Sequence, residues 1–197
     1  MTKESNQEVE LRAILTEKQR ENLFDSVKAK GGIFESEEEI TDHYFCVKTA
    51  KSFKEVEMDE VGSFSLRLRK CTKEGKTKTE LNMKIITKSG DHHSWKEHEV
   101  LVDSFDQADA IVKVLGFKSY FTLEKKRTNF KIDEMLVIAE DIKDFGAALE
   151  VEIITSLDKS EEAKAKIKKL LDDLGVAPGQ IAPKSITNIL MHEKSVF

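Results

Sequence analysis

Charged and apolar residues alternate with a period of two along several short stretches of this 197-residue chain. In the stretch 8–13, two glutamates and an arginine alternate with valine, leucine and alanine. Because successive side chains of a β-strand point to opposite faces, this stretch predicts a strand with one charged and one apolar face. Strand-like patterns occur near residues 7–14, 42–48, 63–70, 79–87, 94–102, 119–132, 134–142 and 148–154.

Three amphipathic runs with a helical period accompany these strands. They span about 16–31, 104–116 and 160–175; a capping box opens each of the first two, and each run ends at a glycine. Glu74-Gly75 and Ser89-Gly90-Asp91 are typical of hairpin turns, which join antiparallel strands. The sequence therefore predicts an α+β fold dominated by antiparallel strands, and we expect residues 1–197 to form a single domain.

Composition limits the class of partner. The chain has 32 Lys and Arg against 37 Asp and Glu, and this net charge of −5 disfavours binding to nucleic acid through many phosphate contacts. No long apolar run is present, so we expect no membrane span. Cys46 and Cys71 are isolated and lack the spacing of a metal site, which is typical of packed thiols in a cytoplasmic protein.

The charged faces differ in sign from strand to strand. Apart from the face of the first strand, the charged faces comprise these sets: Arg67 and Arg69; Glu80, Asn82 and Lys84; Glu97 and Glu99; Lys125 and Arg127; and Glu150 and Glu152. For any one strand, the solvated face of a half-buried sheet is the commoner explanation. Carboxylates near both ends of the chain and cations between them also suit a polyphosphate with a divalent metal, because hard metal ions take carboxylate oxygens while arginine and lysine bind phosphate. The alternation of charged and apolar residues is compatible with both a solvated strand face and a polyphosphate site.

Specific motifs follow one another in the same order as in a known family. They are Glu8-Val9-Glu10-Leu11-Arg12, with arginine where the family pattern ExExK has lysine; Asp42-His43-Tyr44-Phe45; Leu66-Arg67-Leu68-Arg69; Lys84; Glu97-His98-Glu99; Gly116-Phe117 with Lys125-Lys126-Arg127; and Phe145-Gly146 with Glu150-Val151-Glu152. Together they resemble the CYTH domain, or triphosphate tunnel metalloenzyme, family. This family includes class IV adenylyl cyclases, thiamine triphosphatases and inorganic triphosphatases.

The resemblance implies an eight-stranded antiparallel β-barrel, a tunnel with a charged interior and helices packed on its outside. It implies metal binding by Glu8, Glu10 and Glu152, with Glu140 and Glu150 as supporting ligands. It implies a triphosphate clamp made of Arg12, Arg67, Arg69, Lys84, Lys125 and Arg127. Glu8, Glu10, Arg12 and Lys84 are the predicted catalytic residues. Glu140 stands where family members usually have aspartate, and Ile186 where many have tyrosine.

The implied reaction is metal-dependent hydrolysis of a phosphoanhydride bond, with Mg²⁺ or Mn²⁺ as the cofactor. The implied substrate is a small triphosphate: ATP, thiamine triphosphate or tripolyphosphate. Cyclisation of ATP to cyclic AMP and pyrophosphate is the alternative, and a triphosphate-binding module without turnover is a second. The expected assembly is a monomer or a homodimer. Trp95 and Phe121 suit either the hydrophobic core or a stacking platform for a base, and the core is the preferred interpretation.

Overall fold

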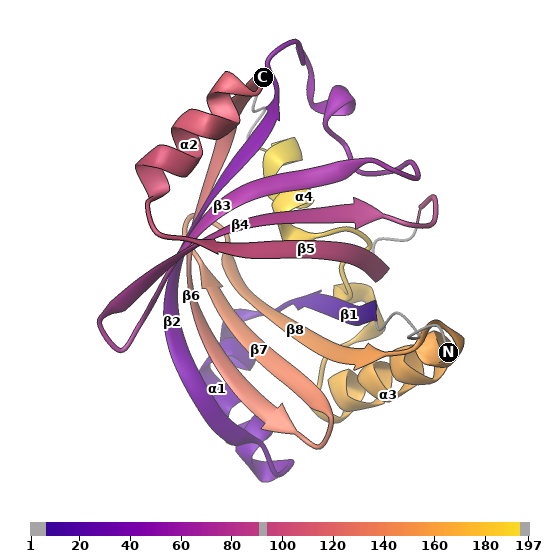
Figure 1. The fold of residues 1–197 in the computed structure, drawn as a ribbon. Coiled ribbons are helices and arrows are strands. Elements are labelled where there is room, and N and C mark those ends of the chain that lie inside the picture. Colours follow the sequence, from indigo (N-terminus) through magenta and orange to yellow (C-terminus); the bar gives the residue numbers. More distant parts are fainter. Residues whose placement is uncertain (1–6, 91–93, 194–197) are drawn as a thin grey trace, which may run out of the picture.

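Eight antiparallel strands close into a barrel in a computed structural model that describes residues 7–90 and 94–193 (Figure 1). The strands are β1 (Gln7–Ile14), β2 (Ile33–Val47), β3 (Phe64–Lys73), β4 (Lys76–Ile86), β5 (Ser94–Val102), β6 (Phe117–Ile132), β7 (Met135–Ile142) and β8 (Gly146–Thr155). Their order around the barrel is β1-β5-β4-β3-β2-β6-β7-β8. The predicted antiparallel barrel is confirmed.

Four helices accompany the strands in the described part of the chain: α1 (Glu17–Ala29), α2 (Phe105–Val114), α3 (Ser160–Asp173) and α4 (Ile186–Glu193). Thr16 and Gln19 form the predicted capping box of α1. Gly116 follows α2 with a φ of 101°, a conformation that strongly favours glycine. None of the described helices is long and apolar enough to cross a membrane.

The outer, apolar faces of the strands form most of the core. Val9 and Leu11 of β1 and Leu149 and Val151 of β8 are at most 3% exposed and lie in one cluster with buried side chains of α1 and α3. A second outer cluster joins β3 with α2. Because these helices cover the apolar faces, the charged faces of β1 and β8 are turned towards the inside of the barrel.

Strand β2 is longer than predicted. It begins at Ile33 instead of near residue 42, and it pairs with β6 from Ile33 to Val47. The sequence hides the first half because its inward positions are polar: buried Ser36 accepts a hydrogen bond from Asn129 of β6 at 2.9 Å and donates one to Glu38 at 3.0 Å. A strand that buries polar groups in this way lacks the alternation from which strands are predicted.

Helix α4 was not expected from the sequence, and it packs against the inner face of the barrel. Its buried residues Ile186, Leu190 and Met191 lie in one cluster with Tyr44 of β2 and Phe121 of β6. Phe121 thus belongs to the core, as predicted, although this part of the core is inside the barrel. The inner face is therefore apolar where α4 covers it, and its charged residues lie beyond that cover.

Replacement of Leu149 tests the packing of the outer face. Leu149 is fully buried, so Leu149→Ala should lower the free energy of unfolding by about 2–5 kcal/mol through lost burial and a residual cavity. Ile154 on the same strand is 71% exposed, and Ile154→Ala should change that free energy by at most about 0.5 kcal/mol. Urea denaturation measures both, and equal effects of the two substitutions would contradict this packing.

Candidate active site inside the barrel

A cavity of about 240 Å³ lies inside the barrel, and its wall is rich in charged side chains. The charged lining residues are Glu8, Arg12, Arg67, Arg69, Lys84, Glu97, Glu99, Lys125, Arg127, Glu140, Glu150 and Glu152. The structure thus brings the predicted site residues together around one cavity, with Glu10 fully buried next to this lining. Apolar side chains, among them Phe53, Val56 and Met58, line another part of the same cavity.

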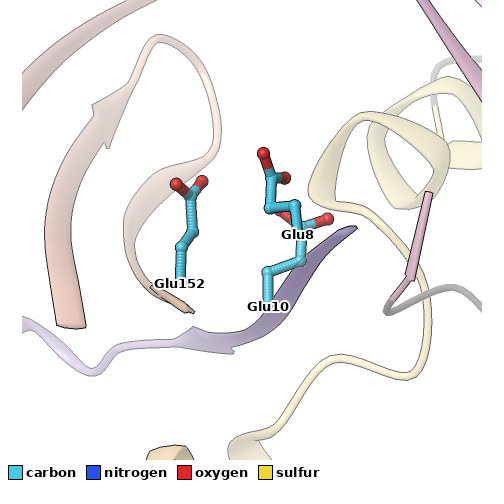
Figure 2. Close-up of side chains that lie close together, drawn as sticks. All are labelled: Glu8, Glu10 and Glu152. Carbon is cyan, nitrogen blue, oxygen red and sulfur yellow. The ribbon is translucent and has the colours of Figure 1, made fainter. Parts of the chain in front are cut away.

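Three glutamates form the acidic side of the cavity. Glu8 and Glu10 project from β1, and Glu152 of β8 is paired with Glu10 across the two strands. One carboxylate oxygen of each lies within 4.8 Å of the others, and Figure 2 shows the three side chains next to one another. Three carboxylates at this spacing could hold a hard divalent cation.

The two carboxylate oxygens of Glu10 differ in their hydrogen bonding. Its Oε1 accepts hydrogen bonds from Arg12 Nη2 and from the indole of Trp95. Its Oε2 is buried, lies 3.8 Å from Lys84 Nζ, and has no hydrogen-bond partner in residues 7–90 and 94–193. Such a buried acceptor is costly unless a further group satisfies it.

Charge crowding on this side shifts pKa values in opposite directions. Burial raises the pKa of Glu10, but the charges of Arg12 and Lys84 outweigh it and hold that pKa below its usual value. Burial and then the carboxylates of Glu150 and Glu8 raise the pKa of Glu152 well above its usual range. A bound cation would relieve this repulsion, so the residues present fit a divalent metal.

Arg12 and Lys84 connect the carboxylates with one another. Arg12 Nε lies 3.3 Å from Glu150 Oε2, while Arg12 Nη1 is buried without a hydrogen-bond partner among the described residues. Lys84 Nζ donates to Glu8 at 2.9 Å and lies 3.7 Å from Glu97. The Arg12 guanidinium therefore keeps a donor available for a bound anion.

The cationic side of the cavity is built on β3 and β6. Arg69 makes two hydrogen bonds to the fully buried Asp42, at 2.7 and 2.8 Å, and Arg67 Nη1 lies 3.8 Å from the same carboxylate. Lys125 and Arg127 both donate to Glu140 Oε1, at 2.5 and 2.8 Å. The structure therefore places Glu140 with these two cations, and the cluster of three carboxylates does not include it.

Two residues of the site carry contacts that the sequence did not indicate. Trp95 was expected in the core; it is buried, but it lines the cavity and donates to Glu10. The sequence marks Asp42 only as part of a motif, because a single aspartate between Ile40 and Tyr44 on one strand face gives no signal of a partner. Its partner, Arg69, is contributed by the neighbouring strand and is found only from the register of β2 with β3.

Comparison with known proteins gives the family of the chain. Residues 6–186 match the CYTH domain, and the chain belongs to the CYTH domain family. No curated protein matches it in sequence.

Solved structures share the fold at low sequence identity. PH1819 from Pyrococcus horikoshii is 22% identical, with a TM-score of 0.77 over 94% of this chain and 99% of its own. HpAC1 from Hippeastrum, a proposed adenylyl cyclase described as revealing a dominant triphosphatase activity, is 14% identical, with a TM-score of 0.66 over 98% of this chain and 97% of its own.

The protonation of Lys125 tests the electrostatics of the cationic side. Burial lowers the pKa of Lys125 to about 8, although Glu140 acts to raise it, so the ammonium should lose its proton as the pH rises through about 8. Glu140→Gln removes the raising charge and should move the midpoint lower. NMR titration of the Lys125 side chain measures both midpoints.

The exposed Glu124 on the same strand provides a control for this titration. Glu124 lies on the outer surface and pairs with Lys143 at 2.8 Å, so Glu124→Gln should leave the Lys125 midpoint unchanged. A Lys125 midpoint near 10.4, the usual value for lysine, would show that the side chain is not desolvated as described.

Proposed function

We propose that this protein is a divalent-metal-dependent triphosphatase, which binds a small triphosphate inside the barrel and hydrolyses a phosphoanhydride bond. The observation that carries the proposal is the pairing, in one cavity, of a three-carboxylate cluster with buried cationic donors that lack partners among the described residues. A triphosphate suits such a cavity, because its oxygens can bind both a divalent metal and the cationic side chains.

The basic residues form the proposed triphosphate clamp: Arg12, Arg67, Arg69, Lys84, Lys125 and Arg127. Arg12 Nη1 and Arg67 Nε are buried and have no hydrogen-bond partner in the described chain, so phosphate oxygens would satisfy them. Charges fixed before the substrate arrives stabilise negative charge that develops as a P–O bond breaks. The clamp thus accounts for both binding and rate acceleration.

Glu8, Glu10 and Glu152 would hold the metal, Mg²⁺ or Mn²⁺. One ligand atom would be Oε2 of Glu10, which has no hydrogen-bond partner in the part of the chain that the structure describes. When bound, the ion supplies Lewis-acid polarisation of the phosphate oxygens. Glu150 would support this set from its contact with Arg12. Glu140 is assigned instead to positioning Lys125 and Arg127, because its carboxylate is engaged by both.

The apolar part of the cavity favours a second candidate, an adenylyl cyclase of class IV. Phe53, Val56 and Met58 offer apolar surface next to the charged lining, and a nucleoside would need such a surface. Hydrolysis remains the first choice because the charged residues alone account for it. The structural relative HpAC1, for which a dominant triphosphatase activity is described, also supports hydrolysis.

A product assay separates these functions. With tripolyphosphate, thiamine triphosphate or ATP and either Mg²⁺ or Mn²⁺, we expect release of orthophosphate from at least one substrate, and none after chelation of the metal. Cyclic AMP and pyrophosphate from ATP, without orthophosphate, would establish the cyclase. Binding of these compounds without any turnover would contradict both enzymes and support a binding module.

The carboxylate pair of β1 tests the metal assignment. Glu8→Gln with Glu10→Gln should abolish metal-dependent turnover and weaken Mn²⁺ binding at least about tenfold, because two anionic ligands are lost. Trp95, the protein's single tryptophan, touches Glu10, so Mn²⁺ quenching of its fluorescence measures binding independently of activity.

Two further variants complete this experiment. Arg12→Ala should raise KM for the triphosphate more than it weakens Mn²⁺ binding, since Arg12 is assigned to the phosphate. Glu124→Gln, on the outer surface, should change neither quantity. Full quenching and full turnover in the double glutamine variant would show that the metal is bound elsewhere.

A further inference from the structure

We propose that Asp42 is a positioning residue, which fixes Arg69 and Arg67 in the orientation that a triphosphate needs. The inference rests on the proposed function, because it concerns how the clamp for that substrate is held. Asp42 is fully buried, and it is not among the residues that line the cavity, whereas Arg67 and Arg69 are. It therefore acts through the arginines and not on the substrate.

The contact between Asp42 and Arg69 is a two-point fork. Arg69 Nε donates to Asp42 Oδ1 at 2.7 Å and Arg69 Nη2 donates to Oδ2 at 2.8 Å. Two parallel bonds fix the plane of the guanidinium as well as its position. They occupy one edge of Arg69, whose side chain lines the cavity, and the guanidinium has three further N–H groups beyond these two bonds.

Arg67 depends on the same carboxylate in a different way. Its Nη1 lies 3.8 Å from Asp42 Oδ2, its Nη2 lies 3.9 Å from Glu97, and its buried Nε has no hydrogen-bond partner in the described part of the chain. Arg67 and Arg69 are two residues apart on one strand face, so they repel each other in a poorly solvated space. The carboxylate of Asp42 offsets that repulsion and allows both to face the cavity.

The buried pair of Asp42 and Arg69 is poorly explained by a contribution to folding stability. A buried ion pair costs desolvation on both sides, and a well-packed apolar pair of similar volume is often as stable. Long arginine side chains otherwise lose rotamer entropy when they bind, and fixing one beforehand removes that loss from the binding step. Asp42 lies behind Arg69, which itself lines the cavity, and this position fits such preorganisation.

Positioning and simple charge balance predict different kinetics. If Asp42 only lowered the positive charge of the clamp, its neutralisation would tighten substrate binding and leave kcat unchanged. If Asp42 orients the clamp, its neutralisation displaces charges that must meet the transition state, and kcat falls. Misplacement by about 1 Å can cost on the order of a hundredfold in rate.

The test is a double-mutant cycle with tripolyphosphate as the substrate. We expect Asp42→Asn to lower kcat about tenfold to a hundredfold with KM unchanged or lower. Arg69→Gln should lower kcat by a similar factor, and the combined variant should lose clearly less than the product of the two factors, because Asp42 acts chiefly through Arg69, which makes both hydrogen bonds to it. A kcat within twofold of wild type in Asp42→Asn, or losses that multiply in the combined variant, would overturn the proposal.

Asp42→Glu is a second variant that tests the proposal if Asp42→Asn fails to fold. It keeps the charge but lengthens the side chain by one methylene group, so it should keep the thermal unfolding midpoint closer to wild type than Asp42→Asn does and still lower kcat. Full kcat in Asp42→Glu would overturn a geometric role. Glu124→Gln serves as the matched surface control and should leave kcat and KM unchanged.

A measurement without turnover separates this inference from the proposed function. The Nε–H of Arg69 is bonded to a buried carboxylate, so its NMR signal should be protected from solvent exchange in the wild type and lose that protection in Asp42→Asn. Equal protection in both would overturn the anchoring role. Absence of turnover on every triphosphate would instead contradict the proposed triphosphatase, and the Arg69 signal would still decide the role of Asp42.

Discussion

Closure of the sheet into a barrel brings the charged faces of strands that are distant in sequence into one enclosed space. Once the apolar strand faces are covered from outside by α1, α2 and α3, the charged faces of β1, β3 and β8 are enclosed with one another. Charges in such a space are poorly solvated, and each must find a partner or remain energetically costly. The charges inside the barrel therefore have to be neutralised by other side chains of the protein, by a ligand, or by both.

Internal neutralisation is extensive but incomplete. Asp42 neutralises part of the charge of Arg67 and Arg69, and Glu140 does the same for Lys125 and Arg127. Among residues 7–90 and 94–193, the buried atoms without a hydrogen-bond partner are of both kinds, since they include a carboxylate oxygen of Glu10 and guanidinium nitrogens of Arg12 and Arg67. A ligand that carries both a cation and anionic oxygens satisfies this remainder better than a simple anion or a simple metal ion would.

The C-terminal segment sets one boundary of the cavity. Helix α4 contributes Ile186 and Met191 to its lining, and the preceding Lys184 forms ion pairs with Glu57 and Asp59 of the β2–β3 connection. The backbone N–H of Ala182 also donates to the carbonyl of Arg12 at 2.8 Å. Segments distant in sequence are thus joined next to the cavity, and α4 limits how much of the barrel interior a substrate can occupy.

The sequence was enough to predict most of the strands, the charged and apolar faces of several of them, and the motifs of the CYTH family. These features follow from local periodicity and residue type, so they can be read without knowledge of distant contacts. Even so, the first half of β2 was hidden, because Ser36 and Glu38 point inward and replace the apolar residues that reveal a strand.

The partner of each charged side chain depends on the strand register in the folded barrel. The sequence placed Glu140 among possible metal ligands, but the register of β7 with β6 sets it opposite Arg127 and within reach of Lys125. The register of β2 with β3 likewise gives Asp42 its contact with Arg69. Such pairings depend on strands that are neighbours in space and not in sequence, and a shift of one residue would turn each side chain to the other face.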